Sequence, residues 1–137
     1  MKKIFLILFL FSCCNLHSQW EQFSNGLFGT DISNFYFQDS TIYISSYTGG
    51  VYKSTDWGNN WSSCNVGLKT LQVINLSFLD NTIIAGTEQG AHISKNNGDS
   101  WEELQDENIE FRFHSIGASI CYNNKFYLYN NTLGNGL

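Results

Sequence analysis

Acid–base or metal chemistry in this sequence would rest on very few side chains. There is one arginine, Arg112, and there are three histidines, His17, His92 and His114. His92 and His114 stand alone in predicted strands, without cysteine or carboxylate partners at metal-ligand spacing, so we interpret both as structural and predict no metal site. No Ser/His/Asp arrangement indicates a nucleophile. The chain by itself therefore predicts no enzyme, no catalytic residue and no cofactor.

The composition describes a folded, acidic and aromatic-rich chain. Of its 137 residues, 42% are apolar, 16% aromatic and only 14% charged, which excludes a charged disordered tail. Twelve glycines, many aromatic residues and the absence of proline favour short strands joined by tight turns. The net charge of −5 argues against nucleic acid as a partner.

The N-terminus has the pattern of a signal peptide. Two lysines precede the apolar residues 4–11, a stretch too short to span a bilayer, so we predict no transmembrane span. We expect residues 1–18 to be removed by cleavage after Ser18, and the chain to be secreted, periplasmic or held at the cell surface. The alternative that we favour less is a lipoprotein, in which a loose lipobox would place a lipid anchor on Cys13.

A period of about forty residues runs through the rest of the chain. Ser54–Trp61 recurs as Ser94–Trp101, forty residues later. Upstream, Phe37–Ile44 matches Phe78–Ala85 and then Cys121–Leu128, at offsets of 41 and 43 residues. A period of this length determines the whole fold, so it outweighs any local pattern.

Each copy is predicted to form four short β-strands. An Asp-Ser or Asp-Asn pair separates the first two strands, and these residues tolerate the tight turn of a hairpin. The strands are expected at 32–38, 41–47, 51–54 and from about 61 in the first full copy, and at 73–79, 82–87, 91–94 and from about 101 in the second. Four strands in about 40 residues is the period of a β-propeller blade.

The predicted fold class is therefore all-β, a partial β-propeller of about two and a half to three four-stranded blades. The copies are expected at 19–30 (a partial outer strand), 31–70, 71–110 and 111–137 (truncated), so that 19–137 form one incomplete domain. A closed ring needs about 4–8 blades, so we expect further blades in a longer parent chain or self-association of this one. Cys121 falls on an inner strand and should be buried, and its pairing with Cys64 stays open.

The segment Ser54–Trp61 resembles the Asp-box, or BNR repeat, of sialidases, sortilin-type Vps10 propellers, xyloglucan-cleaving glycoside hydrolases and Ycf48-like assembly factors. Each motif residue has a physical reason. Asp56 can accept hydrogen bonds from the backbone of the turn, and Ser54 adds a second polar partner. Gly58 permits a positive φ, and Trp61 covers the turn with an apolar face.

The second copy of the motif carries Ser94, Asn96, Gly98 and Trp101 at the same positions. Asn96 replaces the aspartate and can still form the turn, although a charged hydrogen bond is lost. The resemblance implies that such motifs lie at the blade periphery, away from any active site. We therefore predict a structural role for both copies.

The resemblance also implies two enzyme hypotheses. A sialidase needs three arginines to clamp the carboxylate of its substrate, and this chain has only Arg112. A xyloglucan hydrolase needs two carboxylates across a cleft, and the family places a catalytic aspartate just before a Gly-Gly pair. The matching position here is Tyr47, and its equivalent in the next copy is Glu88, which we interpret as a solvated surface residue.

We therefore predict an exported, non-catalytic recognition or scaffold module that binds a glycan or a protein. Trp57, at a variable position inside the motif turn, should be exposed and is our candidate contact. The alternative is the N-terminal fragment of a glycoside hydrolase, sialidase-like or xyloglucanase-like, whose catalytic residues lie in further sequence.

Overall fold

The computed structural model describes residues 24–28, 31–105 and 115–130. The predicted signal peptide, residues 1–18, lies outside this part of the chain, as do Arg112 and His114. Within the described residues the chain forms ten β-strands in three antiparallel sheets and no helix, which confirms the all-β prediction.

The first two sheets have four strands each and the third has two, within the described ranges. The first sheet contains β1 (Ile32–Gln38), β2 (Thr41–Ser46), β3 (Gly50–Ser54) and β4 (Ser62–Ser63). The second contains β5 (Val73–Leu79), β6 (Thr82–Thr87), β7 (Gly90–Ser94) and β8 (Glu102–Glu103). The third contains β9 (Ile116–Tyr122) and β10 (Lys125–Asn130). Each strand lies next to its sequence neighbours in its sheet, as a four-stranded meander requires.

The hairpin turns explain why these boundaries could be predicted. Asp39 and Asp80 each follow the first strand of a sheet and have φ of 52° and 48°. This left-handed conformation is one that Asp and Asn adopt more readily than other non-glycine residues. In the third sheet Asn123 and Asn124 take the same role, with φ of 48° and 57°.

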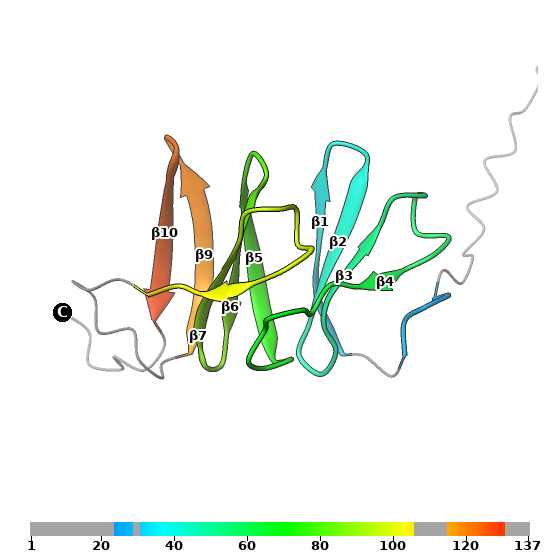
Figure 1. The fold of residues 1–137 in the computed structure, drawn as a ribbon, viewed down its shortest axis with the longest axis horizontal. Helices are drawn as coiled ribbons and strands as arrows, with labels where there is room; N and C mark the ends of the chain where they lie inside the picture. The colour runs from blue at the N-terminus through cyan, green and yellow to red at the C-terminus, as the bar shows by residue number, and fades with distance from the viewer. Residues whose placement is uncertain (1–23, 29–30, 106–114, 131–137) are drawn as a thin grey trace, which may run out of the picture.

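The three sheets pack face to face, and their first strands β1, β5 and β9 stand side by side (Figure 1). The core between the first two sheets consists of buried side chains from both: Tyr43, Val51 and Cys64 from the first, and Val73, Leu76, Ile83, Ala85 and Trp101 from the second. A second cluster joins Ile84 and Ala91 of the second sheet to Ile116 of the third. The other face of the first sheet is partly covered by Leu27.

The cysteines of the described residues, Cys64 and Cys121, differ from the prediction in their burial. Both are free, and the buried one is Cys64, whereas Cys121 is only half-buried. The expectation that Cys121 is a core residue is therefore wrong. Cys121 is the next-to-last residue of β9, beside the β9–β10 hairpin, and the equivalent Phe78 of β5 is also only half-buried.

Candidate functional site

The segment Ser54–Trp61, called turn 1 below, is closed by side-chain hydrogen bonds. Ser54 Oγ accepts from the backbone N–H of Gly58 at 2.8 Å and donates to Asp56 Oδ1 at 2.8 Å. Asp56 Oδ1 also accepts from the backbone N–H of Asn60 at 2.9 Å, and its Oδ2 accepts from Asn60 Nδ2 at 2.7 Å. The hydrogen bond from the Asn60 side chain is the main reason why the pKa of Asp56 lies below its ordinary value.

The segment Ser94–Trp101, called turn 2, repeats this plan with an amide in place of the carboxylate. Ser94 Oγ accepts from the N–H of Gly98 at 2.9 Å and donates to Asn96 Oδ1 at 2.8 Å, which also accepts from the N–H of Ser100 at 3.0 Å. The outer hydrogen bond is reversed, because Asn96 Nδ2 donates to Ser100 Oγ at 2.9 Å. A hydroxyl can accept as well as donate, so this partner suits the uncharged motif.

Trp57 stands exposed in turn 1. It has a φ of 60°, and 67% of the residue is accessible to solvent. A bulky side chain with positive φ is a genuine outlier, and residues held in such conformations cost about 1–3 kcal/mol. The hydrogen bonds of turn 1 therefore hold Trp57 exposed to solvent in a backbone conformation that is energetically unfavourable for tryptophan.

The equivalent residue of turn 2, Asn97, has other surroundings. Its φ is 55°, its N–H donates to the carbonyl of Asn81 at 3.1 Å, and its own carbonyl accepts from Tyr43 Oη at 3.1 Å. Tyr43 belongs to the first sheet, so turn 2 takes part in the contact between the two sheets. Turn 2 therefore lies at the junction between the first two sheets, whereas Trp57 of turn 1 faces solvent in the described part of the chain.

A glycine upstream of each turn packs against the tryptophan that ends it. The N–H of Trp101 donates to the carbonyl of Val66 at 2.8 Å, and a Cβ on Gly67 would lie 2.0 Å from the carbonyl oxygen of Trp101. The same arrangement holds Gly26 against Trp61, where the distance would be 2.1 Å. The eight-residue motif alone does not predict this contact, although the Gly-Leu pair recurs at an offset of 41 residues and could have indicated it.

Tyr47 and Glu88, which precede the glycine turns of the first two sheets, come together. Tyr47 Oη donates to Glu88 Oε1 at 3.3 Å, and Tyr47 is 42% exposed. The backbone N–H of Tyr47 also donates to the carbonyl of Asp31 at 2.9 Å, which brings a second acidic residue into the same loop cluster. The cluster lies at the end of the sheets opposite to the β1–β2 and β5–β6 hairpins (Figure 1).

The remaining candidate groups, His92 and Cys64, are buried. His92 is fully buried, its Nε2 accepts from the N–H of Lys69 at 3.3 Å, and burial lowers its pKa, so the imidazole is neutral. Burial raises the pKa of the Cys64 thiol to about 11, which keeps it protonated. In residues 24–28, 31–105 and 115–130 no group of three His, Cys, Asp or Glu residues could hold a metal ion. Nor is any helix there long and apolar enough to cross a membrane.

The family follows from comparison of the sequence with family models. The model of the DUF6242 β-propeller domain matches residues 11–132. This chain belongs to that family. The three packed sheets of this DUF6242 domain are accordingly propeller blades, which confirms the predicted partial β-propeller.

Two solved structures resemble the DUF6242 domain. One is an ancestral GH74 enzyme, with 28% identity and a TM-score of 0.56, over 65% of this chain and 12% of that one. The other is YCF48 from Cyanidioschyzon merolae, with 14% identity and a TM-score of 0.50, over 68% of this chain and 29% of that one, a likeness in fold alone. The chain thus spans only a small part of either protein. Comparison with curated proteins finds no match.

Proposed function

We propose that this propeller domain is a non-catalytic recognition module, and that Trp57 contacts its ligand, a glycan or a protein. The observation that carries the proposal is the conformation of Trp57, exposed and left-handed on a turn closed by at least four side-chain hydrogen bonds. Strain of this kind is concentrated at functional sites. Tryptophan is also, with Tyr and Arg, one of the residue types enriched among the residues that dominate binding energy.

The rigidity of turn 1 supports a binding role. A side chain that is ordered before binding loses little conformational entropy when the ligand arrives, and rigid aromatic anchors gain affinity for that reason. The proposed location is outside the cytoplasm, secreted, periplasmic or at the cell surface, because of the signal-peptide pattern in residues 1–18. A lipid anchor on Cys13 stays the alternative mode of export.

The test compares the chain with its Trp57→Asn variant on a glycan array and on immobilised surface proteins. Asparagine is the residue at the equivalent position of turn 2, where it keeps φ at 55°, so the turn should stay intact. We expect the variant to bind at least about 30-fold more weakly, as for a residue that dominates an interface. Leu71→Asn, at a residue 45% exposed and outside turn 1, is the matched control. Equal binding by Trp57→Asn and the parent chain would refute the role of Trp57.

A second candidate function is that the domain is part of a glycoside hydrolase, sialidase-like or xyloglucanase-like. It is favoured by the 28% identity to an ancestral GH74 enzyme and by the contact between Tyr47 and Glu88. Hydrolysis by two carboxylates needs an acid and a base across the scissile bond. If this candidate holds, the complete protein cleaves xyloglucan, and Glu88→Gln lowers kcat while Tyr47→Phe has a smaller effect. A complete protein without glycosidase activity would leave the recognition module as the function.

A further inference from the structure

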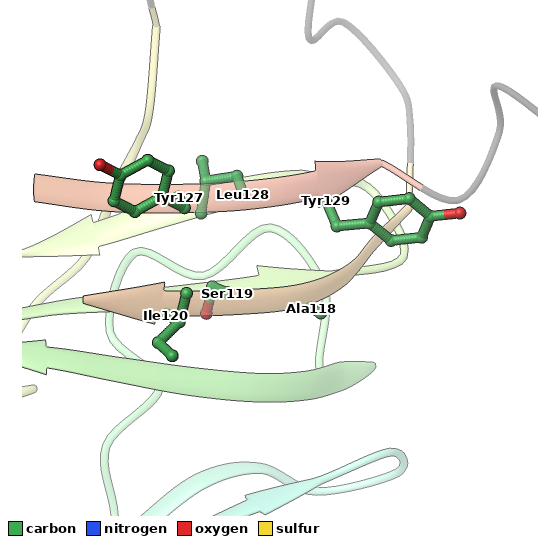
Figure 2. A pocket seen from close by; sticks show the side chains of 6 residues that line it. All are labelled: Ala118, Ser119, Ile120, Tyr127, Leu128 and Tyr129. Carbon is green, nitrogen blue, oxygen red and sulfur yellow. The ribbon is translucent and has the colours of Figure 1, made fainter. Parts of the chain in front are cut away.

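One face of the third sheet is an uncovered apolar surface. Ala118 lies opposite Tyr129 and Ile120 lies opposite Tyr127 in the β9–β10 pairing, so these four side chains share a face. Ile120, Tyr127 and Tyr129 are 62%, 52% and 62% exposed. Their side chains are labelled in Figure 2. They help to line a shallow hollow of about 180 Å³. The other face of this sheet packs on the second sheet through residues that include Leu128.

A second aromatic surface lies at the opposite end of the row of sheets. Phe35 and Phe37 alternate with Tyr36 along β1, so they point away from the second sheet, against which Tyr36 packs. They are 56% and 70% exposed. Phe35 also contacts Trp61 edge-on, with ring centroids 6.5 Å apart, which helps to hold this surface in place.

The junction between the first two sheets shows how two such faces fit together. The ring of Phe78 in the second sheet lies 5.6 Å from that of Tyr36 and 5.2 Å from that of Tyr43 in the first. Tyr36 Oη also accepts from the backbone N–H of Leu76 at 2.9 Å. In this junction Tyr43 is only 2% exposed.

The exposed face of the third sheet and the exposed face of β1 correspond to the two sides of the junction between the first and second sheets. Tyr36 pairs with Tyr43 two residues before the hairpin turn, and Ile120 pairs with Tyr127 at the same place in the third sheet. Phe37 has the place in β1 that Phe78 has in β5, next to last in the strand. Tyr127 therefore corresponds to Tyr43, yet it is 52% exposed where Tyr43 is 2% exposed. Among the described residues no phenylalanine of a neighbouring sheet covers Tyr127, and Phe37, which has the matching place in β1, is itself exposed.

We propose that copies of this chain associate head to tail, with Phe37 of one copy packed against Ile120 and Tyr127 of the next. The contact repeats between molecules the junction that already exists within the molecule, so its geometry is set by the fold. It is heterologous, because two different surfaces meet. Such a contact either closes into a ring or continues as an open chain, and an uncovered apolar face favours association in both cases.

Analytical ultracentrifugation of the purified chain is the first test. We expect species larger than the 15.6 kDa monomer, with a proportion that rises with protein concentration. Phe37→Glu and Tyr127→Glu should each weaken association at least about tenfold, since each puts a charge into the junction. Val66→Glu, at a residue 70% exposed and outside both faces, should change nothing. A parent chain that stays monomeric at submillimolar concentration would refute the proposal.

A mixture of the two variants is the sharper test. The Phe37→Glu variant keeps an intact third sheet and the Tyr127→Glu variant keeps an intact β1, so the equimolar mixture should form a dimer joined through one unaltered junction. Recovery in the mixture also shows that both variants are folded. A mixture that stays monomeric would overturn the head-to-tail contact. Association that survives in either variant alone would also overturn it, and would be expected if copies paired through the edges of β10 instead.

Discussion

Turns 1 and 2 share a backbone plan but have different surroundings. In both, a serine hydroxyl accepts from the glycine N–H and the third residue accepts from the seventh. In turn 2 the left-handed residue is Asn97, which is tied to the first sheet through Tyr43. In turn 1 it is Trp57, two-thirds exposed. The same turn therefore serves as part of a junction in one blade and presents an aromatic side chain in the other.

The difference between the two turns distinguishes the strain of the left-handed residue from the role of its side chain. Asparagine adopts positive φ more readily than most other non-glycine residues, so Asn97 adds little strain to a turn that packs against the first sheet. The turn itself does not require tryptophan at this position, since turn 2 forms the same inner hydrogen bonds with asparagine there. Substitutions that exchange residues between the two turns should therefore separate the energetic cost of the left-handed residue from its function.

The largest effect is expected where turn 2 is held to the preceding blade. Gly67→Ala would put a Cβ 2.0 Å from the carbonyl oxygen of Trp101 at a φ of 90°, so the backbone would have to shift and the hydrogen bond from Trp101 to Val66 would be lost. Strain and the lost hydrogen bond together should lower the free energy of unfolding by about 3 kcal/mol or more. Urea denaturation at fixed protein concentration measures this change.

Gly98→Ala is the matched control inside turn 2. Its Cβ would lie 3.5 Å from Tyr43 Cε1, an ordinary contact, so only the conformational cost of alanine at a φ of 81° applies. That cost is about 1–2 kcal/mol. Equal destabilisation by the two substitutions would mean that the close approach of Gly67 to Trp101 does not determine its effect.

The next largest effect on stability is expected from exchanging the carboxylate of Asp56 and the amide of Asn96. Asp56→Asn should lower the melting temperature by a few degrees, because an amide nitrogen would face the Nδ2 donor of Asn60. Asn96→Asp should be neutral or slightly stabilising, because the hydroxyl of Ser100 can rotate to donate to a carboxylate. Differential scanning calorimetry of the two variants measures the asymmetry, and equal losses would contradict it.

The same exchange of carboxylate and amide should also change how the stability of the domain depends on pH. The pKa of Asp56 is lower in the folded chain than its ordinary value of 3.8, so its contribution to stability is present above that value and is lost as the pH falls through the lower, folded pKa. Asp56→Asn should therefore flatten the fall in melting temperature below about pH 4, and Asn96→Asp should steepen it. The pKa of Glu103 is also lowered, chiefly by a hydrogen bond from Lys69. Glu103 is present in all of these variants, so its contribution to the pH dependence of stability is the same in each.

Much of the fold could be predicted because the decisive signals are local. The turns at Asp39 and Asp80 and the period of about 41 residues place the eight strands of the first two sheets to within about one residue. The side chains that close turn 1 and turn 2 could be named for the same reason, since each motif lies within eight residues of sequence.

The features that could not be predicted from the sequence depend on which sheet faces have a neighbouring sheet. The burial of Cys64 rather than Cys121 and the contact between Tyr47 and Glu88 arise from how one sheet covers the next. The approach of Gly67 to Trp101 joins residues of two blades that are 34 positions apart. A repeat identifies equivalent positions, but it does not say which of them a following sheet covers.

The smallest effect on stability is expected at the feature that distinguishes the turns most. Trp57→Asn should raise the free energy of unfolding by about 1 kcal/mol or less, because it relieves the strain of a bulky residue at a φ of 60° without removing a hydrogen bond of turn 1. The reciprocal Asn97→Trp should be destabilising, because Asn97 lies in the contact with Tyr43. Urea midpoints at fixed concentration measure both changes. If Trp57→Asn is destabilising, the indole ring supports turn 1 by packing and its exposure needs no ligand. If it is stabilising while binding is lost, the chain retains a strained residue at a cost in stability, as functional sites do.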